Sequence, residues 1–382
     1  MKLIYPDYDR SIPNVVASVE QYYGIRRSYE PIDCLKPFMK KKYKNIVLLI
    51  FDGMGSRVLE NALDSSEFLL SRRISDLTTV YPSTTVAAMT SWYSGVTPNE
   101  HGWLGWSLFF KELCRCIDIF PKTDSFTREP CMPLDYHKMI MPYESLMERI
   151  YKKNREIRLH SVFSKGCTPF ENYSRCTSAE SIDDFCRAIR QQCMISGDKF
   201  VFGYWTQPDE ILHSLGCRES ISAGCIRDIS IHMERLSRDL DDTLLIISAD
   251  HGLIDIDEEI YLNTLPDINE CLVMPPSMEA RAAAFFVKNN MCKEFESRFR
   301  KRFGGDFMLM TRSEVLKRGL LGVGVTHSKT SDFLGDYLAV ATGRKIFRYN
   351  TMNGRMSKRM CAHHAGLTED EMLIPLIVFT KQ

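Results

Sequence analysis

The chain of 382 residues lacks an excess of either charge, since 49 Lys and Arg residues balance 49 Asp and Glu residues. Binding a nucleic-acid polymer through its phosphates requires a basic excess, so the composition argues against that class. No apolar run approaches the ~18 residues of a membrane-spanning helix. The first residues contain no apolar segment typical of a signal peptide. We therefore expect neither a nucleic-acid polymer nor a membrane among the partners.

Paired cysteine motifs are also missing. The chain has 13 cysteines, an odd number, and no two of them are separated by two residues. Zinc ribbons and thioredoxin-like redox sites both need such pairs, so neither is expected. We interpret the cysteines as reduced and mostly buried thiols, and we predict a cytoplasmic protein.

What the sequence does contain is a series of short, continuously apolar runs separated by amphipathic stretches. Continuous apolarity is typical of strands buried on both faces, and strands alternating with helices are typical of a parallel sheet. The predicted fold class is α/β, with a mostly parallel central sheet and helices on both faces. The expected strands are Asn45–Phe51, Phe200–Trp205, Thr243–Ala249 and Leu373–Phe379, with weaker candidates at Ile157–Phe163 and Tyr337–Ala341.

Two regions break this alternation. Residues 104–150 carry aromatics, prolines and cysteines without a clear period, and residues 266–350 mix short strands, a helix and turns. No linker rich in Pro, Gly or Ser separates one part of the chain from another. We predict a single α/β domain over 1–382, in which the two regions are insertions that form a cap over the edge of the sheet.

Three aspartates come just after strand-like runs, namely Asp52, Asp209 and Asp250. In open α/β sheets, ligands bind beyond the carboxyl ends of the strands. Carboxylates gathered at that edge would repel one another unless a cation lies among them. An aspartate in such a place is by itself typical of a turn or a helix cap. The repeated placement favours a metal site.

Histidines accompany two of these aspartates. His213 follows Asp209 by four residues, so the two side chains share one face if the segment is helical. His251 directly follows Asp250 in the segment SADHG, where a strand ends and the chain turns. Oxygen and imidazole ligands together suit zinc or a similar divalent ion. The alternative is that these histidines have a purely structural role.

Two further segments carry candidate functional groups. His363 and His364 precede the last strand, where each is either a ligand or a packing residue. Thr84 and Thr85 precede a stretch of small residues that can form a helix. A hydroxyl there is either a plain N-cap or a nucleophile activated by a metal ion, because a helix N-terminus favours an anion.

In this order the motifs resemble the alkaline phosphatase superfamily, and most closely its nucleotide pyrophosphatase/phosphodiesterase branch. That branch has an aspartate after the first strand, a nucleophile at a helix start, Asp-xxx-His, Asp-His-Gly and a late His-Gly. The resemblance covers about residues 45–380. It implies an alkaline phosphatase-like fold and a metal-dependent hydrolase of phosphodiester or pyrophosphate bonds. The substrate would be small and phosphorylated, a nucleotide being one candidate.

The resemblance also implies roles for particular residues. In the superfamily the nucleophile lies ten residues before a glycine that closes the helix; with Gly95 as that glycine, the nucleophile is Thr85, and Thr84 is the alternative. A phosphothreonine intermediate follows. His364 is preferred to His363 because it precedes Ala365 and Gly366, which resemble the family's Gly-Gly with one departure. Two zinc ions are implied, one held by Asp209, His213 and His364 and the other by Asp52, Asp250, His251 and Thr85.

A second departure concerns the substrate. Diesterase relatives often carry an asparagine after the nucleophile, and its position here falls on Trp106. We expect Trp106 to stack on a base or another flat leaving group, the alternative being that it packs the inserted region. His327 is a further candidate for substrate contact.

The expected charges of the site favour a diester. Two divalent cations, three aspartates and a threonine alkoxide sum to zero, which suits a monoanionic diester better than a dianionic monoester. Two alternatives stay open: a phosphomonoesterase or phosphonate hydrolase on the same two-metal scaffold, and a catalytically silent binding protein with the same fold.

Overall fold

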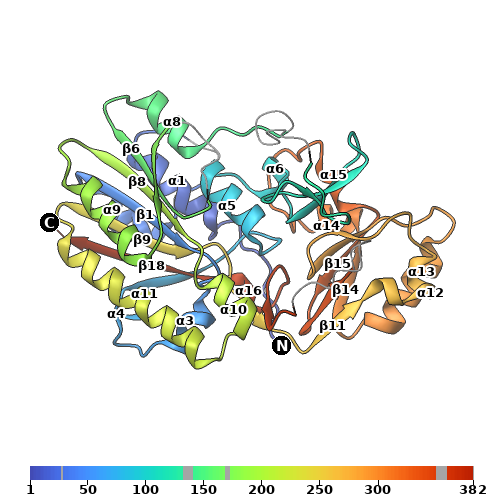
Figure 1. The fold of residues 1–382 in the computed structure, drawn as a ribbon. Coiled ribbons are helices and arrows are strands. Elements are labelled where there is room, and N and C mark those ends of the chain that lie inside the picture. The colour runs from blue at the N-terminus through green and yellow to red at the C-terminus, as the bar shows by residue number, and fades with distance from the viewer. Residues whose placement is uncertain (27–28, 132–140, 168–172, 350–358, 382) are drawn as a thin grey trace.

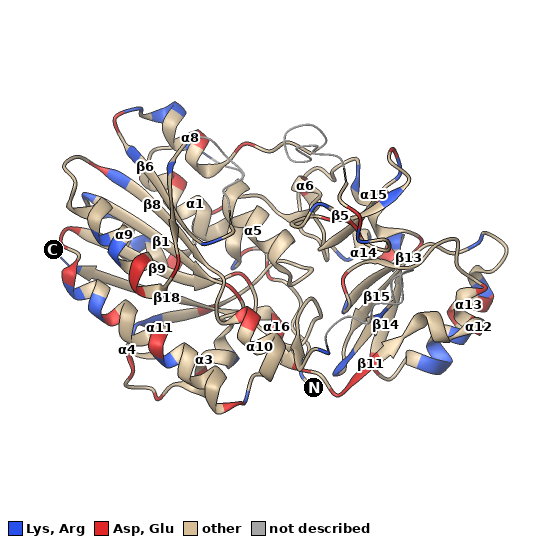
Figure 2. Cartoon of the chain, viewed as in Figure 1, with Lys and Arg blue, Asp and Glu red and all other residues tan. Residues whose placement is uncertain are grey.

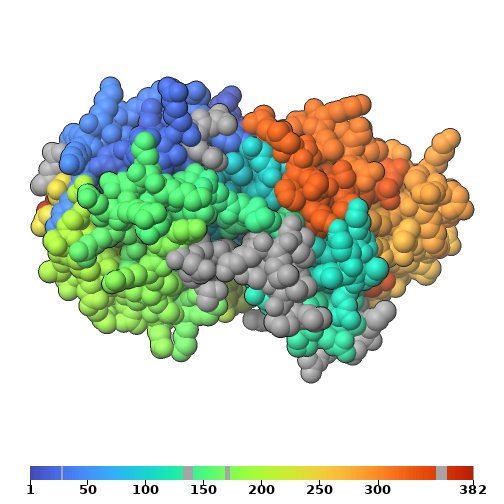
Figure 3. Space-filling view, turned by 90° about the horizontal axis from the view of Figure 1, so that it is seen from above, coloured from blue at the N-terminus to red at the C-terminus, as the bar shows by residue number. Residues whose placement is uncertain are grey.

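The chain forms two seven-stranded sheets that lie beside each other (Figure 1). The computed structural model describes residues 1–26, 29–131, 141–167, 173–349 and 359–381. Viewed from above, the cyan segment that contains α5 and β3 lies between the two halves (Figure 3). Charged residues of both signs are scattered along the outer helices, in keeping with the balanced composition (Figure 2). None of the described helices is long and apolar enough to cross a bilayer.

The first sheet contains the central strands that the sequence predicted. Its middle strands β1, β8 and β9 are buried along their whole length, which explains their continuous apolarity. Each buried aliphatic side chain there contributes roughly 1.5–3 kcal/mol. In spatial order the strands are β2 (Arg73–Thr78), β18 (Leu373–Lys381), β9 (Thr243–Ala249), β1 (Asn45–Phe51), β8 (Lys199–Trp205), β6 (Arg158–Ser164) and β7 (Arg175–Ala179).

The first sheet is mixed, which departs from the predicted arrangement. The pairs β9–β1, β1–β8, β8–β6 and β6–β7 are parallel, whereas β18 is antiparallel to both β9 and β2. The chain enters β18 at Leu373, which pairs with Thr78 at the carboxyl end of β2. The strand must therefore run back across the sheet.

Helices lie on both faces of this sheet (Figure 1). The helices α1, α5 and α8 contact one another, and α11 contacts α3, α4 and α9. The first group is α1 (Ile12–Tyr22), α5 (Thr85–Ser94) and α8 (Leu146–Lys153); the second is α3 (Ser56–Ala62), α4 (Phe68–Ser71), α9 (Ile182–Met194) and α11 (Ser220–Asp239). Shorter helices are α2 (Lys36–Met39), α6 (Pro98–His101), α10 (Asp209–Leu215), α16 (Glu369–Met372) and the 3₁₀ turn at Asp33–Leu35.

The second sheet is built from both regions that the sequence set apart as insertions. Its strands come from 107–124 and 277–341, and the two parts meet where Met278 pairs with Ser107. One predicted strand, Tyr337–Ala341, lies in this sheet and not in the central one. The order is β14 (Phe307–Thr311), β15 (Tyr337–Ala341), β13 (Ala282–Phe285), β12 (Ser277–Met278), β3 (Ser107–Phe110), β4 (Arg115–Asp118) and β5 (Thr123–Asp124).

Helices and short strand pairs complete this half. Phenylalanines of α13 pack against Phe285 and Phe347 in a separate core. The helices are α12 (Pro266–Asn269), α13 (Cys292–Phe303), α14 (Arg312–Lys317), α15 (Thr330–Leu334) and the 3₁₀ turn at Leu262–Thr264. The strand pairs are β10 (Ile254–Asp255) with β17 (Ala362–His363) and β11 (Glu258–Tyr261) with β16 (Lys345–Arg348).

Candidate active site

The parallel strands bring the three predicted aspartates to one edge of the first sheet. Phe51, the last residue of β1, is in register with Trp205 of β8 and Ala249 of β9. Asp52 and Asp250 therefore follow neighbouring strands directly. The amide of Asp209, at the start of α10, donates to the carbonyl of Asp52 at 3.0 Å. Strand register and one helix start thus place carboxylates side by side that are far apart in the sequence.

Three histidines point their Nε2 atoms to this edge because their Nδ1 atoms are already engaged. A carbonyl oxygen can only accept, so each Nδ1 that lies beside a carbonyl carries the hydrogen and leaves Nε2 free as a ligand atom. The main-chain partners are Ala362 for His213 (2.7 Å), Gly252 for His251 (3.2 Å) and Ser83 for His364 (3.1 Å).

Each aspartate also has one buried oxygen without a hydrogen-bond partner among the described residues. These atoms are Asp52 Oδ1, Asp209 Oδ1 and Asp250 Oδ2. Such atoms are rare in folded proteins and call for an explanation. Oδ1 of Asp52 and Oδ2 of Asp250 both lie 3.4 Å from Nε2 of His251, and Oδ1 of Asp209 lies 3.3 Å from Nε2 of His213.

This spacing fits ligands of a divalent ion. Zinc bonds of about 2.0–2.1 Å in tetrahedral geometry place ligand atoms roughly 3.3–3.4 Å apart. Two sets of three ligand atoms lie within 4.8 Å of one another, the first from Asp52, Asp250 and His251 and the second from Asp209, His251 and His364. The donor set and its unpartnered oxygens therefore suit bound cations better than an empty pocket.

The electrostatics agree with that fit. Burial, together with the neighbouring charges of Asp250 and Asp209, raises the pKa of Asp52 well above its ordinary value. Burial also raises the pKa of Asp250. Burial holds the pKa of His364 well below its ordinary value, so its imidazole is neutral and able to bind a cation. Without a cation, ionised carboxylates at this edge are costly.

Thr85 is the hydroxyl that faces this cluster. It is the first residue of α5, and its Oγ1 lies 3.1 Å from Nε2 of His251. Thr84, the alternative nucleophile, is the N-cap, and its hydroxyl donates to Glu279 Oε1 at 2.6 Å. The small residues Ala87 and Ala88 let the helix lie close to the sheet, and all its residues are buried.

Two backbone features hold the histidine loops. A side chain on Gly252 would place its Cβ 2.1 Å from the carbonyl oxygen of Asp370, so the residue after His251 must be glycine. Ala365, which departs from the family's glycine, has a φ of 93° and is fully buried. An alanine in this region is strained by roughly 1–2 kcal/mol. The local fold therefore prefers glycine at 365.

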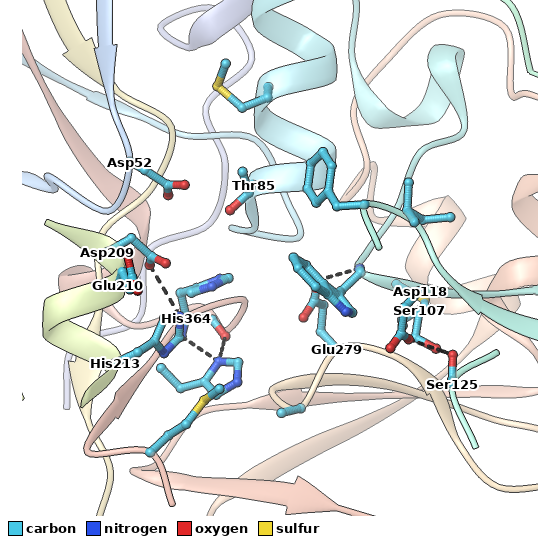
Figure 4. A pocket seen from close by; sticks show the side chains of 18 of the residues that line it. Asp52, Thr85, Ser107, Asp118, Ser125, Asp209, Glu210, His213, Glu279 and His364 are labelled. Carbon is cyan, nitrogen blue, oxygen red and sulfur yellow. Dashed lines mark hydrogen bonds and ion pairs between the residues drawn. The ribbon is translucent and has the colours of Figure 1, made fainter. Parts of the chain in front are cut away.

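Four of the predicted ligands, Asp52, Asp209, His213 and His364, border a cavity of about 840 Å³ between the two sheets, while Asp250 and His251 lie fully buried behind them (Figure 4). Trp106, the predicted substrate contact, lines the cavity with 41% of its surface exposed, and its ring meets that of Phe120 at 5.4 Å. His327 is not among the lining residues; its ring lies beside Gly102. The labelled lining residues are Asp52, Thr85, Asp209, Glu210, His213 and His364 toward one sheet and Ser107, Asp118, Ser125 and Glu279 toward the other.

Two residues that sequence reasoning did not single out contribute to the site. Tyr204 of β8 donates its hydroxyl hydrogen to Asp52 Oδ2. Its neighbour relation to Asp52 follows from the observed parallel pairing of β1 and β8, in which Tyr204 is in register with Ile50. Glu279 lines the cavity from the turn between β12 and β13. No motif or spacing marks that residue.

Comparisons with known proteins agree with these observations. The model of the type I phosphodiesterase/nucleotide pyrophosphatase family matches residues 46–298. No curated protein sequence gave a significant match.

Solved structures resemble this fold over most of its length. Murine ectonucleotide pyrophosphatase/phosphodiesterase 5, solved as an inactive variant in complex with AMP, is 15% identical, with a TM-score of 0.66 over 89% of this chain and 88% of that chain. The human protein of the same name is 16% identical, with a TM-score of 0.67 over 88% of this chain and 87% of that chain. Phosphonoacetate hydrolase from Sinorhizobium meliloti, in complex with phosphonoformate, is 16% identical, with a TM-score of 0.62 over 88% of this chain and 90% of that chain.

Proposed function

Because the chain belongs to the type I phosphodiesterase/nucleotide pyrophosphatase family, we propose that it hydrolyses phosphodiester or pyrophosphate bonds with Thr85 as nucleophile. One observation carries this proposal. Three buried carboxylate oxygens without hydrogen-bond partners among the described residues lie in two ligand-like groups with Nε2 of His251 and His364, and the hydroxyl of Thr85 lies 3.1 Å from Nε2 of His251. A protein that used these groups only for stability would pair them.

The proposed cofactors are two divalent cations, with zinc the best match to mixed oxygen and imidazole ligands. Cations at such a site stabilise the charge on the attacking and leaving oxygens of an in-line displacement. Asp209, His213 and His364 would hold one ion. Asp52, Thr85, Asp250 and His251 would hold the other.

The residues of the chain account for a two-step reaction. Oγ1 of Thr85 attacks phosphorus, the bond from phosphorus to the leaving oxygen breaks, and the threonine proton ends on the departing alcohol. Water then attacks the phosphothreonine, which releases the phosphorylated product and restores the hydroxyl. Tyr204, through its hydrogen bond to Asp52, holds one ligand carboxylate in place during both steps.

The charge of the cavity favours a monoanionic diester. Two cations, three aspartates and a threonine alkoxide sum to zero. Three cationic side chains line the cavity, namely Lys122, Arg128 and Arg348. Arg128 pairs with Asp118 and Arg348 pairs with Glu259, so neither arginine adds net charge for a second phosphate anion. Trp106 and Phe120 offer an aromatic wall for a flat leaving group such as a nucleoside.

A second candidate is hydrolysis of a phosphonate or a phosphomonoester on the same scaffold. The observation in its favour is the fold shared with phosphonoacetate hydrolase, which was solved in complex with phosphonoformate. A catalytically silent binding protein is a weaker alternative, because Thr85 and all the expected ligand positions carry suitable side chains. All 13 cysteines are free thiols, which suits the cytoplasmic location that we also propose.

The test compares zinc-loaded wild-type protein on bis(p-nitrophenyl) phosphate and on p-nitrophenyl phosphate. We expect faster cleavage of the diester. Thr85→Ala should reduce turnover by about a thousandfold or more, since no other hydroxyl replaces the nucleophile. Zinc should be retained, because Asp52, Asp250 and His251 would still hold the ion that Thr85 contacts. The matched control is Thr90→Ala, in the same helix, whose hydroxyl donates only to the carbonyl of Val86. Wild-type turnover that persists in Thr85→Ala would refute the assignment, and faster monoester cleavage would favour the second candidate.

A further inference from the structure

Glu279 is a buried carboxyl group in the cavity wall that the two-step reaction does not use. It lies in the turn between β12 and β13, on the side of the cavity opposite the aspartates (Figure 4). Only 9% of its surface is exposed. A carboxyl group is rarely buried so far unless its oxygens are satisfied or it serves a ligand.

The two oxygens of Glu279 have different surroundings. Oε1 accepts from the hydroxyl of Thr84 at 2.6 Å and from the main-chain amide of Trp106 at 2.7 Å. Among the described residues, Oε2 has no hydrogen-bond partner. Both lone pairs of Oε1 are therefore occupied, and Oε2 is the atom left for a ligand in the cavity.

The contact with Thr84 places this carboxyl beside the proposed reaction. Thr84 directly precedes Thr85, whose Oγ1 would attack phosphorus. The other contact, Trp106, supplies the ring proposed to hold the leaving group. Glu279 is therefore hydrogen-bonded both to the residue before the proposed nucleophile and to the residue of the proposed leaving-group wall.

The two donors on Oε1 also decide where a proton of Glu279 resides. An oxygen that accepts two hydrogen bonds is not the site of protonation, so the acid proton lies on Oε2. Burial raises the pKa of Glu279 to about 7. The hydrogen bonds from Thr84 and Trp106 and the charge of His251 oppose this rise, and Asp118 adds to it. Tyr81 is a further titratable neighbour.

We propose that Glu279 contacts the substrate by donating a hydrogen bond from Oε2 to a non-bridging oxygen of the phosphoryl group. The proposal rests on the function proposed above and assigns a further substrate-binding residue to that reaction. A neutral carboxyl adds a donor without adding a negative charge, so it strengthens binding of an anionic phosphoryl group.

The experiment measures binding without turnover. Zinc-loaded Thr85→Ala protein is titrated with bis(p-nitrophenyl) phosphate by calorimetry at pH 6.5, alone and combined with Glu279→Gln or Glu279→Ala. The amide of glutamine can accept from Thr84 and Trp106 through its oxygen and still donate through Nε2. We expect Glu279→Gln to bind within about threefold of the parent and Glu279→Ala to bind at least about tenfold more weakly.

Two further variants separate this role from a structural one. Glu279→Met keeps the bulk of the side chain and should match Glu279→Ala, so the proposal stays testable if the alanine variant does not fold. Asp124→Asn removes a buried charge from the same sheet, where Asp124 accepts from the amides of Phe126 and Thr127 and does not line the cavity. It should bind like the parent.

If Glu279→Ala and Glu279→Met bind the diester as tightly as the parent or more tightly, the proposal is overturned. Such a result would mean that the side chain of Glu279 makes no favourable contact, or that its ionised carboxylate repels the phosphoryl group in the parent. Absence of measurable binding to the parent would overturn it as well. Failure of the proposed function is a separate result. It would appear as no turnover of either ester by the wild type, whatever the binding constants.

Discussion

Glu371 and Asp250 are both fully buried carboxylates, but their surroundings differ completely. Glu371 receives Nε and Nη2 of Arg281 at 2.6 and 2.8 Å, the amide of Gly366 at 2.6 Å and the hydroxyl of Thr368 at 2.6 Å. Asp250 receives two main-chain amides on Oδ1, and its Oδ2 has no partner among the described residues.

This difference separates a structural carboxylate from one that awaits a ligand. The charge of Glu371 is compensated inside the chain, where it ties the loop of His364 to the second sheet through Arg281. The charge of Asp250 is not compensated, and Asp52 and Asp209 beside it have the same deficit. Removing one member of each kind should therefore have opposite consequences for stability and for function.

The largest effect is expected from Asp250→Asn, on activity. The variant should lose bound metal and at least about a thousandfold in kcat/KM, because metal ions supply several kcal/mol of transition-state stabilisation. Its metal-free form should be more stable than metal-free wild type, since a neutral amide costs less to bury than a carboxylate. Metal analysis, kinetics and urea unfolding measure the three quantities. Unchanged metal content would show that Asp250 is not a ligand.

Glu371→Gln should act in the opposite way, on stability. Arg281 would be left buried without its counter-charge, which typically costs about 3–5 kcal/mol. The free energy of unfolding from urea titration of the metal-free protein measures this loss. The double variant Arg281→Met with Glu371→Met is the control, because replacing both charges by apolar groups is often neutral. A loss below about 1 kcal/mol would place this pair among weak surface-like pairs.

The dependence of stability on pH should distinguish the unpaired aspartates further. The raised pKa means that Asp52 keeps its proton in the folded protein at pH values where the unfolded chain has lost it. The contribution of Asp52 to the free energy of unfolding is therefore fully present below about pH 4 and is lost as pH rises. Asp52→Asn removes this loss. In metal-free protein, the advantage of the variant over wild type should grow as pH rises above about 4, and zinc should abolish it. An advantage that shrinks with rising pH would contradict the assignment.

The smallest effect is expected from Trp106→Ala, which touches neither carboxylate cluster. Its exposed ring is proposed to hold the leaving group, so relative rates across aryl, nucleoside and alkyl diesters should shift several-fold, by about 1 kcal/mol. Zinc content and unfolding should stay as in the wild type. Phe120→Ala, which removes the ring that Trp106 meets, gives a matched comparison. Identical relative rates in both variants would assign Trp106 to packing.

Local pattern predicted much of this molecule. Continuous apolar runs identified the strands β1, β8 and β9, because a strand buried on both faces has no polar side. The ordered motifs from Asp52 to His364 predicted the family, which the family model confirms. Each of these patterns lies within a short segment of the chain, where backbone geometry and the neighbouring side chains determine the local structure.

Long-range pairing lay beyond that reasoning. Neither the reversed direction of β18 nor the joining of 107–124 with 277–341 into one sheet follows from residues close in sequence. For the same reason His327 was expected at the substrate and lies beside Gly102 instead, while Glu279 was not expected and lines the cavity. Motif and spacing indicated which residue types do the chemistry. The tertiary structure decided which other side chains face these residues, because that depends on how segments distant in the sequence pack. This packing buries the apolar side chains of the whole core together and is not set by any single segment of the chain.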